Sequence, residues 1–116
     1  YITAASTPKE IMYGYIFNNC TISCAPECEK MYLGRPWRDY AYTLFMHCEL
    51  PAQIRPEGWH HWQKEREQTA RYLEFENSGE GAATDKRAGW SRVLTKKEAR
   101  DITPENVFRR ADGWQP

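Results

Sequence analysis

Arg35 is the residue of this chain whose surroundings best suit chemistry. It lies between Gly34, which lets the backbone approach a neighbour closely, and Pro36, which stiffens the backbone that follows. These flanking residues should hold the guanidinium rigidly, and bidentate binding of a carboxylate requires such a rigid planar fork. Trp37 is placed to offer a flat apolar face beside that charge. The spacing alone leaves two interpretations open, a structural salt bridge and a clamp for a carboxylate at a functional site.

The composition narrows the classes of partner. Aromatic residues make up 14% of the 116 residues, and several have polar neighbours, as in the segment 58–62; such aromatics often line a ligand groove. The 16 basic and 16 acidic residues cancel, so we expect no nucleic-acid partner. The basic pair Lys86–Arg87 is interpreted as solvated surface, and attraction of a polyanionic chain is the alternative. The longest apolar and aromatic stretch, Ile11–Phe17, is far shorter than the ~20 residues of a membrane helix, so no membrane span is predicted.

Three similar strand-like segments must carry these residues. They are rich in β-branched and aromatic side chains and span residues 12–23, 42–48 and 69–77. Aligning Phe17, Phe45 and Phe75 gives steps of 28 and 30 residues, the scale of solenoid coils that stack on one another. An ordinary β-rich domain with evenly spaced strands is the alternative. In a solenoid, the Pro- and Gly-containing loops between the strands would project from one face and build a binding site.

The C-terminal tail has helix signals. Thr95–Glu98 has the spacing of a capping box, which predicts a short helix through about Asp101. Thr103 followed by Pro104 predicts a second helical turn or two through Phe108. We expect this tail to cover the open end of the β stack, where an uncovered layer invites aggregation.

Several motifs, taken in order, resemble the C-terminal part of the pectin methylesterases, and the most specific of them is the Leu-Gly-Arg-Pro-Trp motif at 33–37. The resemblance implies a mainly β fold, a right-handed parallel β-helix with short C-terminal helices. Residues 1–116 would form one unit, with β coils and loops over about 1–94 and a helical capping tail over 95–116. The segments that carry the resemblance are Tyr1–Thr7, Phe17–Ile22, Tyr32–Trp37, Gly58–Trp62, Tyr72–Phe75, Asn77–Ala82 and Arg92–Thr95.

The resemblance also implies an activity, the removal of methyl groups from galacturonate esters in plant cell-wall pectin. In that family one Asp attacks the ester carbonyl, a second Asp acts as acid and then as base, and Gln side chains stabilise the oxyanion. Arg35 matches the Arg that keeps the nucleophilic Asp ionised and aimed, so we expect it to be catalytic. Trp37 matches a Trp that packs against the sugar. No cofactor and no metal are implied.

Two further residues are expected near the substrate. By similarity, Tyr1 would stand beside the groove and Trp62 would line it. A strand residue packed on its neighbour is the alternative for Tyr1, and a core or loop-anchoring residue is the alternative for Trp62. Trp59 is interpreted as structural.

The family's catalytic Asp and Gln residues lie upstream of the segment that matches Tyr1, so the resemblance implies that they lie outside these residues. We therefore expect no esterase activity from this chain alone, and expect an upstream segment of the same protein to complete the site. The chain starts at Tyr1 without an initiator Met, as a fragment or processed chain would. A noncatalytic carbohydrate-binding β-helix module is the alternative function. The family implies secretion or a periplasmic location.

Four cysteines remain to be placed. Cys20 and Cys48 each close a similar strand segment, so we expect them to stack in neighbouring coils. Cys24 and Cys28 flank a probable loop in which a disulfide is geometrically possible. Free thiols, a disulfide and a zinc site with histidine ligands all stay open at this point.

Overall fold

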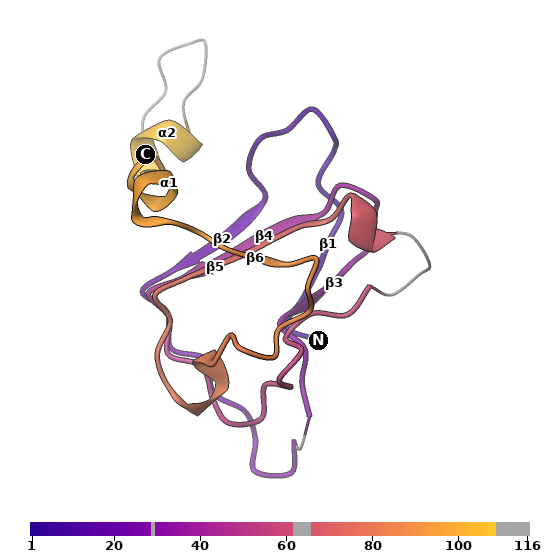
Figure 1. Ribbon diagram of the computed structural model, residues 1–116, viewed down its shortest axis with the longest axis vertical. Coiled ribbons are helices and arrows are strands. Elements are labelled where there is room, and N and C mark those ends of the chain that lie inside the picture. The colour runs from indigo at the N-terminus through magenta and orange to yellow at the C-terminus, as the bar shows by residue number, and fades with distance from the viewer. Residues whose placement is uncertain (29, 62–65, 109–116) are drawn as a thin grey trace.

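Short parallel strands wind into stacked coils in the computed structural model, which describes residues 1–28, 30–61 and 66–108 (Figure 1). One sheet has the strand order β1-β3 and the other β2-β4-β5-β6, and every pair in both sheets is parallel. This is the right-handed parallel β-helix expected from the sequence. The elements of the coils are β1 (Thr3–Ala5), β2 (Tyr15–Asn18), β3 (Gly34–Pro36), β4 (Tyr42–Met46), η1 (Arg66–Gln68), β5 (Arg71–Phe75), η2 (Glu80–Ala82) and β6 (Arg92–Val93).

The register of the long sheet corrects one part of the predicted repeat. Phe17 pairs with Phe45, as the alignment of aromatic residues predicted. Phe45, however, pairs with Glu74, and Phe75 pairs with Met46. The predicted place of Phe75 was therefore wrong by one residue. Because side chains alternate between the two faces of a strand, this shift turns Phe75 outward and carries Glu74 into the interior.

A repeated corner explains why the strands are shorter than the three segments predicted from residue types. Asn19, His47 and Glu76 follow the ends of β2, β4 and β5 and have φ values of 60°, 52° and 46°. These values lie in the left-handed region, which non-glycine residues adopt only where the surrounding structure enforces it. Each strand therefore ends at the same corner of its coil, and the chain turns there into the next face of the β-helix.

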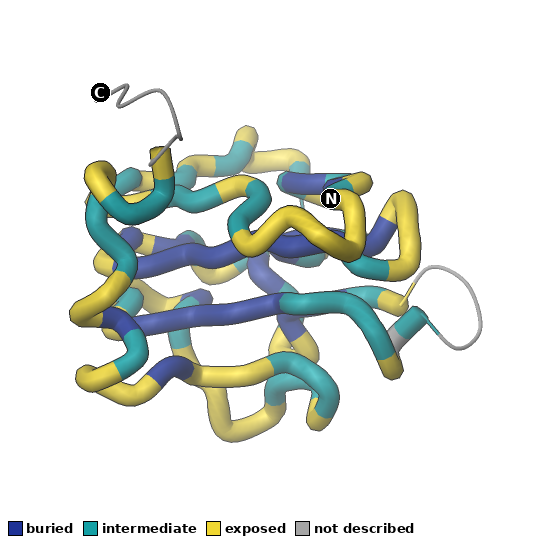
Figure 2. The backbone as a smooth tube through the Cα atoms, turned by 90° about the horizontal axis from the view of Figure 1, so that it is seen from above, coloured by how far each residue is buried: buried dark blue, intermediate teal, exposed yellow. Residues whose placement is uncertain are grey.

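The core fills the interior that the coils enclose, and aromatic rings from successive coils stack on one another there. Phe17 and Phe45 stack with centroids 4.6 Å apart, and Trp59 and Tyr72 stack at 4.2 Å. Full burial of a large apolar side chain such as Phe45 stabilises a fold by about 1.5–3 kcal/mol. Buried residues run along the middle strands, drawn dark blue in Figure 2. The interior cluster consists of Ala5, Leu33, Ala41, Phe45, Cys48, Leu50, Ile54, Trp59 and Tyr72.

Two short helices follow the coils and confirm the predicted helix signals. In α1 (Lys96–Arg100) the amide of Glu98 donates to the hydroxyl of Thr95 and the amide of Thr95 donates to the Glu98 carboxylate, both at 3.1 Å. In α2 (Pro104–Val107) the hydroxyl of Thr103 accepts from the amide of Asn106 at 3.2 Å. Among the described residues, no helix combines the length and apolar character that crossing a membrane requires.

The position of these helices corrects the expectation that the tail covers the end of the stack. Leu94, Ala99 and Ile102 pack on the outer face of the long sheet instead. Strand alternation leaves apolar side chains on that outer face, and covering them removes apolar surface from water. The side chains covered there belong to Tyr42, Leu44, Met46, Leu73 and Phe75.

The cysteines are free thiols. Cys20 and Cys48 lie in neighbouring coils, as predicted: the Cys20 carbonyl accepts from the amide of Glu49 at 2.9 Å. Burial raises the pKa of the Cys48 thiol, which makes it a poor nucleophile. The Cys24 sulfur lies 3.0 Å from the sulfur of Met31, and neither Cys24 nor Cys28 forms a disulfide.

Candidate functional site

The strand β3 presents Arg35 on the outer face of the short sheet. Its neighbours in the strand are buried, whereas Arg35 is half-buried, as the alternation of a strand requires. Gly34 is needed because a Cβ there would collide with the hydroxyl of Thr3 and come within 3.1 Å of the Trp59 ring. On the adjacent strand β1 the register partner of Arg35 is Ala4. The residue directly across from Arg35 on β1 therefore contributes only a methyl side chain.

An aromatic stack lies next to Arg35 and consists of Tyr1, Tyr32 and His60, one ring from each of three successive coils. The centroids of Tyr1 and Tyr32 are 5.5 Å apart, and those of Tyr32 and His60 are 5.1 Å apart. The hydroxyl of Tyr1 and Nδ1 of His60 share a hydrogen bond of 2.9 Å. The Arg35 Cζ lies 4.5 Å from the Tyr1 centroid, and the Arg55 Cζ lies 5.0 Å from the Tyr32 centroid. Each guanidinium thus makes a cation–π contact with the stack.

Trp37 projects from the loop that follows β3. It is 53% exposed, while its backbone amide donates to the carbonyl of Ala5 at 2.8 Å. Arg66 steadies the same loop, because it donates to the carbonyl of Pro36 at 3.0 Å and lies 3.3 Å from the carboxylate of Asp39. A large ring held out on an anchored loop is suited to packing against a sugar.

A buried ion pair supports the site from below. Glu74 is 2% exposed, and its carboxylate accepts from Arg87 Nε at 2.8 Å and from Arg87 Nη2 at 2.9 Å. The same carboxylate accepts from the Trp59 indole at 3.2 Å, and the indole ring lies directly beneath Gly34. The pair therefore fixes the aromatic floor on which β3 rests. Arg87 also donates to the backbone carbonyls of Arg55, Pro56 and Gly81.

Positive charge at the site shapes the titration of its neighbours. Burial raises the pKa of Tyr72 far above its ordinary value, and the nearby charge of Arg35 opposes part of that rise. For His60 the direction is opposite: burial, followed by the charges of His61, Arg35 and Arg55, lowers the pKa of the ring. Among the described residues, the guanidiniums of Arg35 and Arg55 bring positive charge onto the rings of the aromatic stack.

This arrangement, an outward Arg on a parallel coil followed by an exposed Trp, can now be set beside known proteins. The sequence pattern of the family described as pectinesterase matches residues 1–111. The chain belongs to the pectinesterase family. The resemblance inferred from the ordered motifs is thereby confirmed.

Curated relatives of this chain include plant proteins. A probable pectinesterase/pectinesterase inhibitor of Brassica napus is 39% identical over an alignment of 118 residues, gaps included. The alignment covers 90% of this chain and 20% of the relative. The probable pectinesterase/pectinesterase inhibitor 64 of Arabidopsis thaliana is 33% identical over 112 residues, which cover 87% of this chain and 18% of the relative. The solved structure of pectin methylesterase from carrot matches with a TM-score of 0.78 and 30% identity, covering 90% of this chain and 35% of that one. This chain therefore spans about a fifth of the curated relatives' length.

Three of the four site residues predicted from the sequence lie within the described residues. Arg35 and Tyr1 are in contact, and Tyr1 is 46% exposed as a member of the aromatic stack. Trp37 lies two residues beyond Arg35, exposed in the loop that follows β3. Trp62 lies outside the described residues. Trp59 is 2% exposed, which confirms its structural interpretation.

Sequence reasoning missed the groups that surround Arg35 in this pectinesterase chain. Arg55 precedes Pro56 just as Arg35 precedes Pro36, so a repeated Arg-Pro pair was available as a signal. Arg87 was assigned to a solvated surface, and this was wrong: its side chain is 5% exposed and is paired with a buried carboxylate. No local pattern distinguished it from the neighbouring Lys86.

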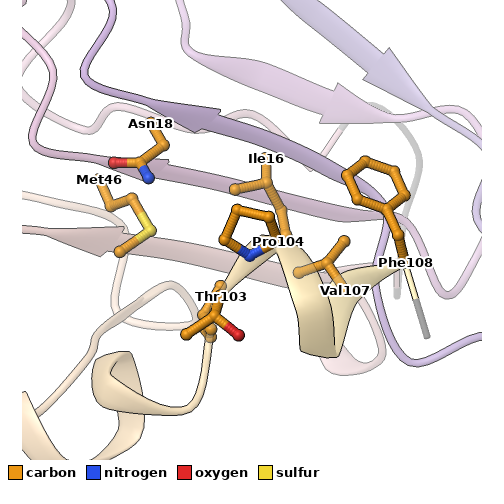
Figure 3. Close-up of a pocket in the computed structure, with 9 residues that line it drawn as sticks. Ile16, Asn18, Met46, Thr103, Pro104, Val107 and Phe108 are labelled. Carbon is orange, nitrogen blue, oxygen red and sulfur yellow. The ribbon is translucent and has the colours of Figure 1, made fainter. Parts of the chain in front are cut away.

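An apolar pocket of about 210 Å³ lies elsewhere, between β2 and α2 (Figure 3). Ile16 and Met46 of the long sheet face Val107 and Phe108 across it. Arg35, by contrast, is carried by the short sheet. We therefore assign the candidate site of this pectinesterase chain to β3 and the aromatic stack, and not to this pocket.

Proposed function

We propose that this chain is the C-terminal portion of a pectin methylesterase and that it supplies Arg35 to an active site completed by an upstream segment. The whole protein would hydrolyse methyl esters of polygalacturonate in plant cell-wall pectin, outside the cell or in a periplasm. The observation that carries this proposal is the outward guanidinium of Arg35, held one strand away from a strand edge that can accept a further coil.

The unpaired edges of β1 and β2 favour the proposal that an upstream segment adds further coils. Within the described residues, β1 pairs with β3 alone and β2 pairs with β4 alone, so each has one unpaired edge on the same side of the stack. Tyr15 on β2 is 56% exposed, and Phe17 stacks on Phe45 from that side. Unpaired edges readily take up another strand, and a solenoid continues by adding coils in this way.

The chemistry proposed for the completed site has two steps. An Asp carboxylate of the upstream segment attacks the ester carbonyl, and methanol leaves with a proton from a second Asp, which gives an acyl-enzyme. That second Asp then takes a proton from water, which attacks the acyl group, releases galacturonate and regenerates the first carboxylate. Arg35 would stabilise the ionised nucleophile and hold it in line, as an opposite charge close to a carboxylate does.

Ala4 provides a direct test of the proposed reach of Arg35. A strand beyond β1 would lie about 10 Å from β3, two strand spacings away, with Ala4 between them. Replacing Ala4 by Leu should fill that gap, displace the guanidinium and lower turnover of the full-length protein at least about tenfold, because small misplacements of reacting groups are costly. Ala4→Ser keeps the gap and should retain most of the turnover. The rate of methanol release should be measured for both variants. Equal rates would contradict the proposal that Arg35 reaches over Ala4 to the upstream strand.

The function itself is tested by joining the chain to its upstream coils. We expect the full-length protein to release methanol from highly methylated pectin and the isolated chain to release none. If the full-length protein bound oligogalacturonate but released no methanol, the noncatalytic binding module would be the better description.

A further inference from the structure

Arg55 is a half-buried guanidinium that the proposed ester chemistry does not use. Within the described residues it forms no ion pair, although carboxylates elsewhere in the fold pair with Arg66, Arg87 and Arg92. Its charged group lies on the face of Tyr32 instead, 5.0 Å from the ring centroid. A guanidinium is more often paired with a carboxylate when water is partly excluded from it. Arg55 therefore retains donors that a carboxylate from outside the chain can take.

The backbone holds Arg55 in place independently of its side chain. Its amide donates to the carbonyl of Met31 at 2.7 Å, and its carbonyl accepts from the amide of Gly58 at 2.9 Å. The same carbonyl also accepts from Arg87 at 3.3 Å. The start of the side chain is thus fixed by the neighbouring coil and by the buried ion pair. A preorganised fork loses little freedom when it binds an anion.

The aromatic stack joins Arg55 to Arg35. Arg35 lies over Tyr1, Arg55 lies over Tyr32, and these two rings stack directly at 5.5 Å. Two fixed positive charges therefore lie over adjacent rings. Rings next to guanidiniums match an acidic sugar polymer, whose residues offer an apolar ring face and a carboxylate.

We propose that Arg55, seated on Tyr32, is a binding subsite for the free carboxylate of an unesterified galacturonate residue near the residue whose ester faces Arg35. The proposal rests on the proposed function, because the same polymer must lie across both positions. A methyl-esterified residue carries no charge and gives Arg55 no charge-assisted hydrogen bond. The subsite would thus make the enzyme favour ester groups near residues that have already lost their methyl groups.

The test compares two ligands of equal length, trigalacturonate and its fully methyl-esterified form, by titration calorimetry on the full-length protein with its upstream nucleophilic Asp replaced by Asn, so that the esterified ligand is not hydrolysed. Arg55→Gln removes the charge and should weaken trigalacturonate binding about tenfold, which corresponds to the loss of one charge-assisted hydrogen bond. Its affinity for the esterified ligand should fall by less than about twofold, which is a fifth of that factor. Equal weakening of both ligands, or none of either, overturns the proposal.

Two further variants separate charge from packing. Arg55→Lys keeps the charge and an aliphatic stem over Tyr32 but loses the planar fork. Its affinity for trigalacturonate should therefore lie between those of the unmodified protein and Arg55→Gln. An affinity lower than that of Arg55→Gln would contradict the subsite. Arg100→Gln is the matched control, because it removes the same charge from an exposed position on α1, which packs on the other sheet. It should leave both affinities unchanged.

The subsite and the proposed function fail in different ways. If the full-length protein releases methanol but Arg55→Gln does not distinguish the two ligands, the subsite is wrong and the function stands. If the protein releases no methanol but Arg55→Gln weakens trigalacturonate selectively, the subsite stands and the esterase assignment is wrong.

Discussion

Replacing Arg35 by Lys in the full-length protein should lower turnover of methylated pectin about 100-fold, the scale of loss when a catalytic group is misplaced by about 1 Å. Lysine keeps the charge but replaces a planar fork with a point charge on a flexible stem. The carboxylate that Arg35 is proposed to hold would stay ionised but would no longer be aimed. Lysine can keep a cation over the exposed ring of Tyr1, so we expect the free energy of unfolding to change by less than about 1 kcal/mol.

Initial rates of methanol release and urea denaturation of the same variant provide the measurement. Arg38→Lys is the matched control, since Arg38 is an exposed arginine three residues further along, in the loop that follows β3. It should change neither quantity. A variant at position 35 that lost stability in proportion to its activity would show that Arg35 is a structural residue and would remove it from the active site.

Replacing Glu74 by Gln should have the largest effect on stability. The substitution leaves the Arg87 guanidinium buried without its compensating charge, and breaking a buried pair in this way costs about 3–5 kcal/mol. The side chains of both residues are almost fully buried, at 2% and 5% exposure, so solvent screens the loss very little. The indole of Trp59 loses part of its acceptor as well. Urea denaturation of the full-length protein should therefore show a much lower midpoint.

A second variant tests whether the stranded charge causes that loss. Glu74→Leu combined with Arg87→Met removes both charges, and buried pairs replaced by apolar residues of similar volume are often nearly neutral. The double variant should recover much of the stability, although three backbone carbonyls lose the guanidinium that donates to them. Asp39→Asn, at a pair whose carboxylate is 69% exposed, should cost far less than Glu74→Gln. If both substitutions lowered the free energy of unfolding by similar amounts, burial would not be the cause of the large loss expected at Glu74.

The buried pair also links stability to the candidate site. Glu74 binds the indole of Trp59, and that ring lies beneath the glycine that precedes Arg35. Arg87 binds the backbone of Arg55 from the other side. One ion pair thus positions the strand that carries the proposed catalytic guanidinium and the loop that carries the proposed subsite.

The sequence by itself determined the features that depend on near neighbours. The capping box at Thr95 and the N-cap at Thr103 could be predicted because each is closed by atoms three residues apart. The coil spacing could be predicted from recurring aromatic residues, and Phe17 does pair with Phe45. The motif around Arg35 pointed to the site because Gly and Pro restrict the backbone locally.

The tertiary structure alone decided the features that join residues far apart in sequence. The aromatic ring of Phe75 was the expected match to Phe45, but in the structure Phe45 pairs with Glu74. The interior can hold the Glu74 carboxylate because Arg87, 13 residues further along the chain, pairs with it there. The aromatic stack joins Tyr1 to His60 across 59 residues, and only the stacking of coils brings them together. The tail lies on the outer face of the sheet because alternation leaves apolar side chains there that water would otherwise meet.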